Sequence, residues 1–444
     1  MSKALWIPTA WLFFCLSRSF SQWMGASPTG QAVAAAAYVE GSPTDAAVYA
    51  ALEVIALIVV ITRWRRVGPI LFRNWPFLLF FSYAALSISW SDFPFVTFKH
   101  WIKGIGDLMM VLIVISEENV IRAVDCLTTR LAFVLVPLSV LFIKYYPLLG
   151  RVLNMSFQME WVGVSTQKNG LGELCDFLGL AILWRIRCAY RDREDPRRKR
   201  HLLALSAVFA MIVWLLWMCD SMTSISALIM AMIVMFFLTR PIFQNRTALV
   251  HLLVATLFSF TLYALFFQSS GSLLENLGRN PTLTGRTEIW KMALSVPNNR
   301  LIGVGYESFW LGSRLEYLWQ AFPGFRVNEA HNGYIEILLT LGWTGAVLLG
   351  ILIAMGYRNA VSSYRRNPYL GSLRIGFFLA AMINALTEAA FRMMGGPWIF
   401  FLLATAAVQV HDESGLGNQR RTSSLSPSRI RQTDDDPKDA QVLY

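Results

Sequence analysis

Residues 333–356 read G-Y-I-E-I-L-L-T-L-G-W-T-G-A-V-L-L-G-I-L-I-A-M-G, which is 24 residues with one charged side chain, Glu336. A helix needs about 20 mostly apolar residues to cross a bilayer, so this stretch predicts a transmembrane helix. The rest of the chain has a similar character, because 55% of its residues are hydrophobic and 15% are charged. Soluble domains have about a quarter of their residues charged. The sequence therefore predicts an all-α, polytopic membrane protein.

Further apolar stretches of suitable length recur along the chain, and we predict about twelve transmembrane helices. No clear cleavage site follows the first stretch, so we interpret it as a helix and not as a removable signal. The predicted spans are residues 4–22, 46–62, 75–91, 101–116, 129–147, 168–187, 202–219, 222–239, 248–267, 333–356, 372–391 and 396–410.

Lysine and arginine gather in four of the connections, residues 63–73, 185–200, 240–246 and 358–374. Positively charged loops stay in the cytoplasm, and twelve spans with a cytoplasmic N-terminus place all four connections on that side. We therefore predict that both termini are cytoplasmic. The same rule explains the net charge of +11, so nucleic-acid binding is not predicted.

This topology divides the chain into four parts. Residues 1–267 hold about nine spans, 268–332 form one large outer loop, 333–411 hold about three spans, and 412–444 form a polar cytoplasmic tail that we expect to be disordered. Most connections are short, and a structured loop as long as 268–332 is usually functional. Because this loop mixes tryptophans with charges of both signs, we expect short helices on the outer membrane face.

The loop contains residue types suited to chemistry on a phosphorylated lipid. Arg286 lies in T-L-T-G-R-T-E-I-W, residues 282–290, and His331 ends the loop. An arginine is a bidentate donor suited to a diphosphate, and a histidine is the side chain best able to take a proton near neutral pH. We therefore predict that Arg286 binds a diphosphate leaving group and that His331 deprotonates a sugar hydroxyl. Neither an Asp-rich motif nor a Cys/His cluster stands out, so the predicted reaction needs no metal and no cofactor.

A second loop segment, residues 297–309, contains Gly303 and Gly305. These glycines allow a tight backbone path, which we interpret as an approach to a ligand. Glu307 follows them and is predicted to contact substrate.

From His331 the sequence reads H-N, nine residues, Gly342, two residues and Gly345. This pattern resembles the signature of the O-antigen ligase and polymerase superfamily, and the preceding T-G-R and glycine segments are also similar to that family. The resemblance covers roughly residues 160–400. It implies transfer of a glycan from an undecaprenyl-diphosphate carrier to an acceptor hydroxyl, at the periplasmic face of a bacterial inner membrane. It also implies that His331 is the base or orients the acceptor, beside Asn332, and that Arg286 holds the diphosphate.

One departure from the family pattern affects the predicted activity. The ligases have an arginine near a membrane span where this chain reads D-S-M-T-S, residues 220–224. This form looks more like exopolysaccharide polymerases of the succinoglycan type, which implies polymerisation of lipid-linked repeat units. A ligase acting on lipid A-core or protein, and a transporter or flippase of lipid-linked sugar, are the alternatives. A chain-length regulator and a flippase are partners implied by the resemblance.

Several candidate residues keep two interpretations. Arg279 or Lys168 supplies the second positive charge, although Lys168 is equally suited to reach the membrane surface without touching substrate. Ser224 binds substrate or hydrogen-bonds between helices with its neighbours. His331 alternatively caps the following helix, and Arg286 alternatively pairs with Glu288 or Glu329. Glu388 and Arg392, four residues apart, are predicted to form an ion pair on one helix face.

Overall fold

The computed structural model describes residues 2–25, 41–153, 158–266, 284–322 and 327–408. Within these residues the chain is almost entirely helical, and its sheet is one hairpin in which Arg151–Leu153 (β1) pairs antiparallel with Met159–Trp161 (β2). The predicted all-α membrane class is confirmed. The predicted tail, residues 412–444, lies outside the described residues, as does Arg279.

Helices follow one another along the chain with short connections. Those before the hairpin are η1 (Lys3–Leu5), α1 (Trp6–Cys15), α2 (Phe20–Trp23), α4 (Pro43–Thr62), α5 (Trp64–Arg73), α6 (Trp75–Leu86), η2 (Ser87–Ser89), α7 (Pro94–Ile115), α8 (Val120–Tyr145) and α9 (Pro147–Gly150). Those after it are α10 (Lys168–Arg191), α11 (Arg198–Cys219), α12 (Met222–Phe237), α13 (Pro241–Asn245), α14 (Thr247–Phe266), α15 (Thr284–Ser295), α16 (Gly312–Ala321), α17 (Gly333–Arg366), α18 (Pro368–Thr387) and α19 (Gly396–Thr405).

A helix occupies each of the twelve predicted spans. Six of the described helices, α4, α8, α11, α14, α17 and α18, are long and apolar enough to cross a membrane, and α1, α6, α12 and α19 are shorter apolar helices. The remaining two, α7 and α10, carry buried carboxyl groups within their apolar stretches, Asp107 in α7 and Asp176 in α10. The number of spans therefore stays a prediction.

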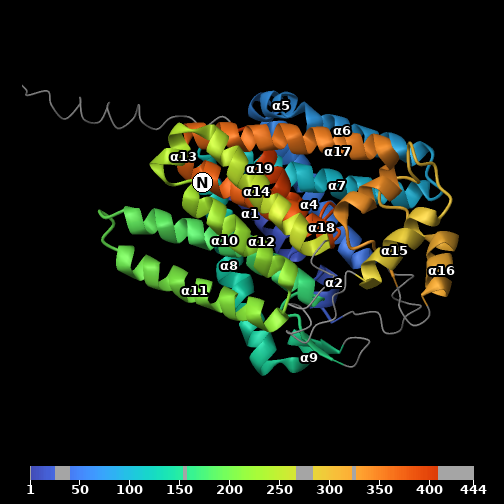
Figure 1. Ribbon diagram of the computed structural model, residues 1–444, viewed down its shortest axis with the longest axis horizontal. Coiled ribbons are helices and arrows are strands. Elements are labelled where there is room, and N and C mark those ends of the chain that lie inside the picture. The colour runs from blue at the N-terminus through green and yellow to red at the C-terminus, as the bar shows by residue number, and fades with distance from the viewer. Residues whose placement is uncertain (1, 26–40, 154–157, 267–283, 323–326, 409–444) are drawn as a thin grey trace, which may run out of the picture. The chain divides into compact units, whose positions relative to one another are not determined.

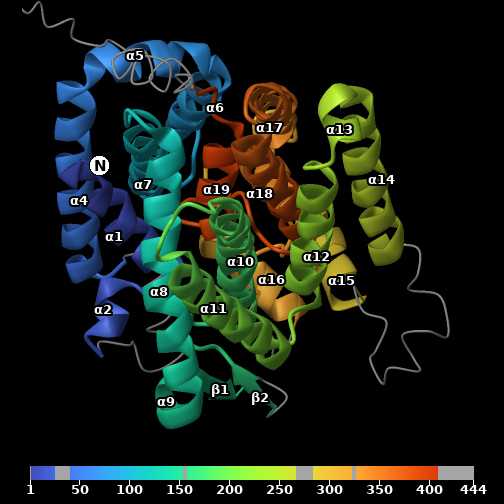
Figure 2. The same ribbon diagram turned by 90° about the vertical axis from the view of Figure 1, so that its left-hand side faces the viewer.

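Helix α18 lies at the centre of the bundle, where it packs against α10, α12, α17 and α19 (Figure 2). Every residue of α18 from Leu370 to Thr387 is buried. Small side chains such as Ala380, Ala381 and Ala385 allow the neighbouring helices to approach closely, as is typical of membrane bundles. The residues at the ends of α18 are therefore held firmly by four neighbours.

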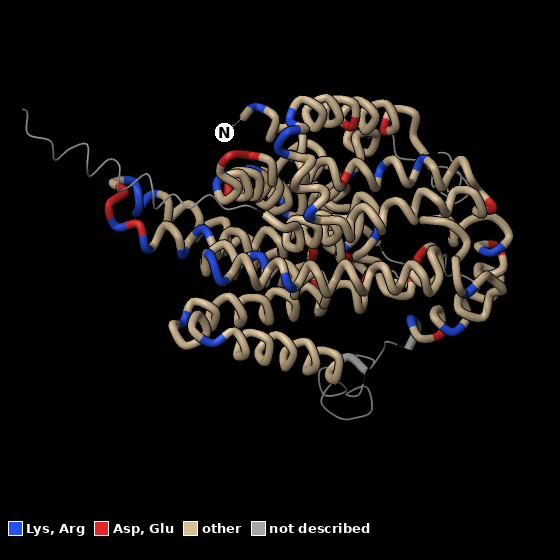
Figure 3. Tube along the Cα trace, turned by 90° about the horizontal axis from the view of Figure 1, so that it is seen from above, with Lys and Arg blue, Asp and Glu red and all other residues tan. Residues whose placement is uncertain are grey.

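Two of the basic connections lie at the opposite end of the bundle from the described helices of the large loop. Figure 1 shows α13 and the α10–α11 connection at the left end, and α15 and α16 at the right end. Along the helices between the two ends few charged residues occur (Figure 3). This separation agrees with the opposite sides that the sequence predicts for these segments.

The described part of the large loop has a small hydrophobic core of its own. Ile289 and Trp290 of α15 pack with Leu315 and Leu318 of α16 and with Phe309 between these helices. The prediction of short helices in this loop is therefore confirmed for its described residues. Their core fixes the loop against the first turns of α17, because Leu339 belongs to the same cluster.

Candidate functional site

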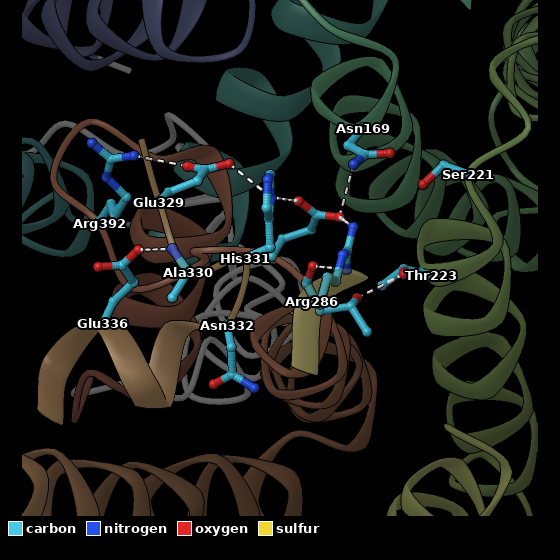
Figure 4. A network of polar contacts seen from close by, with 12 residues as sticks. Asn169, Ser221, Thr223, Arg286, Glu329, Ala330, His331, Asn332, Glu336 and Arg392 are labelled. Atoms are coloured by element: carbon cyan, nitrogen blue, oxygen red, sulfur yellow. Dashed lines mark hydrogen bonds and ion pairs between the residues drawn. The ribbon is translucent and has the colours of Figure 1, made fainter. Parts of the chain in front are cut away.

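Polar side chains of the loop converge on Glu388, the residue that follows α18. Its carboxylate accepts a hydrogen bond from Asn169 Nδ2 at 2.8 Å and pairs with Arg286 Nη2 at 3.0 Å, both through Oε1. The other oxygen, Oε2, lies 3.4 Å from His331 Nδ1. The structure thus brings together Arg286 and His331, which are 45 residues apart in the sequence, at one carboxylate (Figure 4).

Arg286 is held at the end of α18 by more than this ion pair. It belongs to the first turn of α15, and its guanidinium also donates to the carbonyl oxygen of Thr387, the last residue of α18. A cation is favoured there, because the C-terminus of a helix carries partial negative charge. The hydroxyl of Thr387 in turn contacts that of Thr223, 2.7 Å away on α12. Arg286 therefore pairs with neither of the two glutamates, Glu288 and Glu329, that its alternative interpretation named.

His331 has a strained backbone that its neighbours enforce. Its φ of 48° lies in the left-handed region that non-glycine residues rarely adopt. The preceding residue, Ala330, is fixed on both sides, because Trp290 Nε1 donates to its carbonyl oxygen at 2.7 Å and its N–H donates to Glu336. Trp310 Nε1 holds the second oxygen of Glu336 at 2.9 Å. The imidazole is thereby aimed by the backbone before any substrate arrives.

The second cation of the site is Arg392, which the sequence analysis did not assign to it. Its Nη1 lies 2.8 Å from Glu329, and its Nε lies 3.3 Å from Glu307. The predicted Glu388–Arg392 pair on one helix face is wrong, because α18 ends at Thr387 and the following residues form a turn. The two residues point to different partners instead.

Six charged groups form a connected series. Arg286 pairs with Glu388, Glu388 with His331, His331 Nδ1 with Glu329 at 2.9 Å, Glu329 with Arg392, and Arg392 with Glu307. We call these six residues the ionic chain. Its positive and negative groups alternate when His331 is protonated.

The ionic chain fixes the protonation of its middle members. Burial by itself lowers the pKa of His331, but hydrogen bonds and charges from Glu329 and Glu388 outweigh burial and raise the pKa to about 9. Burial likewise opposes ionisation of Glu329, whereas His331 and Arg392 together lower its pKa to about 2. Near pH 7 His331 is therefore an imidazolium. The predicted roles of His331, as the base or as the residue that orients the acceptor, stay predictions, and in the structure its Nδ1 faces the two carboxylates.

Glu329, His331 and Glu388 could each offer one ligand atom to a metal ion, because these atoms lie within 4.8 Å of one another. Both carboxylates already pair with arginines, however, and Nδ1 of His331 already contacts Glu329 and Glu388. A metal would have to displace these interactions. The charge balance favours ion pairs here, so we do not assign these residues as metal ligands.

The other predicted site residues have structural partners. Asn332 caps α17 by accepting hydrogen bonds from the N–H groups of Tyr334 and Ile335, both at 3.0 Å, and donates to the carbonyl of Leu386. Lys168 pairs with Glu160 at 3.1 Å at the start of α10. These contacts provide a helix cap and a surface ion pair.

Ser224 and Glu307 also have partners within the protein. Ser224 is buried and its hydroxyl lies 3.1 Å from that of Ser221, the N-cap of the same helix, against Gly172 of α10. The hydrogen bond from this segment to another helix is made by Thr223 instead, and substrate binding by Ser224 stays a prediction. Glu307 belongs to the site, but through Arg392 and the backbone N–H of Met393.

The glycine segments of the loop and of α17 form one backbone contact. Helix α17 is interrupted at Gly342, whose φ is 65°, and this break exposes backbone groups. Trp343 N donates to Arg300 O at 2.9 Å, and Gly305 N donates to Thr340 O at 2.9 Å. A Cβ at Gly303 would lie 2.3 Å from Thr340 O, so no side chain fits. The tight backbone path that these glycines predict is present, and it brings the loop against the backbone of α17, whereas an approach to a ligand stays a prediction.

Comparison with known proteins finds a match to one family model and to one curated relative. A family model described as O-antigen ligase matches residues 178–350. Over this region the chain is similar to the O-antigen ligase family. A curated relative, the exopolysaccharide production protein ExoQ of Rhizobium meliloti (strain 1021), is 33% identical over 90 residues. This match covers 19% of the chain and 21% of the length of that relative.

The region that matches the family model contains some members of the ionic chain and omits others. Arg286, Glu307, Glu329 and His331 lie within residues 178–350, whereas the remaining two members lie beyond that range. Sequence reasoning noted Glu388 and Arg392 but paired them with each other. The predicted span 372–391 ends within this pair of residues. If the span had been predicted to end four residues earlier, at residue 387, both Glu388 and Arg392 would have been placed in the following turn.

Proposed function

We propose that the chain is a metal-independent glycosyltransferase that polymerises oligosaccharide repeat units carried on undecaprenyl diphosphate into exopolysaccharide. The observation that carries this proposal is the meeting of Arg286 and protonated His331 at Glu388, at the end of the bundle away from the basic connections. Two adjacent cations at a membrane surface suit a lipid diphosphate.

In this proposal Arg286 and His331 hold the diphosphate of the donor as it leaves the sugar. The contacts of His331 use Nδ1, so Nε2, on the opposite edge of the ring, would donate to a diphosphate oxygen. Both cations then stabilise the charge that develops on the leaving group, which is an efficient form of catalysis at a preorganised site. The strained backbone of His331 supports such preorganisation.

The proposed location is a bacterial inner membrane, with residues 268–332 as a periplasmic catalytic loop and both termini in the cytoplasm. The basic connections at the opposite end support this orientation. Polymerisation is preferred over ligation for two reasons. Residues 220–224 contain no arginine, and the curated relative is named for exopolysaccharide production. A chain-length regulator and a flippase remain predicted partners.

The test replaces Arg286 and His331 singly with alanine in cells that make the polymer, with Arg66→Ala in an exposed ion pair as the matched control. We expect single repeat units to accumulate on the carrier at the periplasmic face, with no long polymer. A ligase defect would instead leave long glycans on the carrier, and a flippase defect would leave units on the cytoplasmic face. Normal polymer in both variants would refute the proposed site.

A further inference from the structure

One end of the ionic chain is a cation with a single carboxylate partner. Arg286 is a terminal member with one carboxylate partner, Glu388, whereas Arg392 lies between Glu307 and Glu329. The three cations and three carboxylates balance while His331 is protonated. A diphosphate adds negative charge, so its arrival must break one existing pair or bring a proton into the site.

The surroundings of Glu388 combine unfavourable charges with three donors. It follows the last residue of α18, where the negative end of the helix dipole opposes a carboxylate. Glu329 and Glu173 are close enough to Glu388 to interact through their charges. Three donors offset this repulsion, namely Arg286 from α15, Asn169 from α10 and His331 from the loop. Without Arg286, the carboxylate of Glu388 would keep Asn169 and His331 as its partners.

We propose that the donor diphosphate displaces Glu388 from Arg286, and that the released carboxylate is the base that accepts the proton of the attacking hydroxyl. This inference rests on the proposed function. It gives Glu388 a catalytic role and makes the base available only when donor is bound.

The reaction step balances with these groups. The acceptor hydroxyl oxygen forms a bond to the anomeric carbon, while the bond from that carbon to the diphosphate oxygen breaks. The electron pair of the broken bond leaves with the polyprenyl diphosphate, which Arg286 and His331 bind. The hydroxyl proton moves to Glu388 and passes to solvent after the product departs, when Arg286 pairs with Glu388 again.

His331 is a poorer base in the donor complex than Glu388. It already carries a proton near neutral pH, since Glu329 and Glu388 raise its pKa to about 9 despite its burial. A bound diphosphate adds negative charge beside the imidazolium and favours the charged form further. The carboxylate that Arg286 releases is instead free to accept a hydrogen bond from the acceptor hydroxyl.

The experiment measures farnesyl diphosphate binding to the purified full-length chain, together with polymer formation in cells. Glu388→Gln removes the competing charge from Arg286, so we expect farnesyl diphosphate to bind about fivefold more tightly. The same variant lacks a base, so we expect the rate of polymer formation to fall by about 100-fold. A residue with only a structural role would weaken both binding and turnover. Weaker binding in Glu388→Gln, or normal polymer formation, would therefore overturn the inference.

Three further variants separate the possible failures. Glu388→Asp keeps a carboxylate and should retain part of the polymer formation, whereas Glu118→Gln, in an exposed pair with Arg66, should match the native chain in both measurements. Arg286→Gln should lose farnesyl diphosphate binding. If Arg286→Gln binds as well as the native chain, the proposed function itself fails. If Arg286→Gln loses farnesyl diphosphate binding but Glu388→Gln does not bind it more tightly, the proposed displacement of Glu388 is refuted and the proposed function is not.

Discussion

The two arginines of the ionic chain come from unlike regions. Arg286 belongs to the large loop and pairs with one carboxylate, whereas Arg392 belongs to the short turn between α18 and α19 and pairs with two. Both side chains are about one-fifth to one-quarter exposed, so burial does not distinguish them. The two arginines differ instead in the number of carboxylates that they contact. An arginine with one partner can exchange it for a ligand, and an arginine shared by two carboxylates holds a structure together.

The largest expected effect concerns Arg286→Gln. Because this arginine is assigned to the leaving group, its loss should reduce the rate of polymer formation by about 10² to 10³-fold. The unfolding temperature of the purified protein in detergent should change little, since Glu388 keeps Asn169 and His331 as partners. A large fall in that temperature with normal polymer would reverse the roles assigned to the two arginines.

Arg392→Gln should show the opposite pattern. It leaves Glu307 and Glu329 without their shared guanidinium, and breaking a buried ion pair costs about 3 kcal/mol or more. We expect a clear fall in the unfolding temperature. The double variant Arg392→Gln with Glu307→Gln also removes one of the two carboxylates that lose Arg392. Its unfolding temperature should therefore be higher than that of Arg392→Gln alone. No recovery would mean that Glu307 is not the charge that destabilises the single variant.

A third test uses pH to examine the middle of the ionic chain. The pKa of His331 is raised from 6.5 to about 9, so its ion pairs stabilise the folded state fully below pH 6.5. That stabilisation is lost as the pH rises from 6.5 through about 9. The unfolding temperature of the native chain should fall over this interval, and that of His331→Gln should fall less. Equal slopes would show that His331 is not held in its charged form.

The smallest expected effect concerns the support of His331. Trp290→Phe removes the indole hydrogen bond to Ala330, which contributes about 1 kcal/mol, and should slow polymer formation several-fold. Trp319→Phe is a matched control, because it removes a similar bond to Val327, away from His331. If both variants are equally slow, the effect belongs to the loop in general and not to the strained backbone of His331.

The sequence predicts the features that depend on local pattern or on loop length. Apolar runs such as 333–356 locate helices, and the aromatic content of the long loop predicts its short helices. Arg286 and His331 are found because they stand in recognisable segments. The role of Glu388 depends instead on where α18 ends, and the last turn of a helix is set by tertiary contacts as much as by sequence. The predicted span ends at residue 391, but α18 ends four residues earlier, at Thr387. Glu388 and Arg392 therefore do not pair on one helix face, and each forms ion pairs with other residues.

Capping and close backbone approach are also difficult to predict from one sequence. Asn332 looks like a partner of His331, yet its side chain caps α17 and reaches Leu386. Gly303 and Gly342 both indicate an unusual backbone, but the sequence does not say that they face each other. Each of these contacts joins residues that are distant in the chain or requires an atomic geometry that residue types do not specify.

The contact between the 300–305 segment and the break in α17 has a consequence for biosynthesis. The large loop is synthesised before α17, so its glycine segment lacks its α17 partners when it leaves the ribosome. Those partners are complete only once the chain has been made beyond Thr344, in the first part of α17. The loop is thus completed by the helix that follows it, and truncation of nascent chains before residue 344 should leave it open to protease.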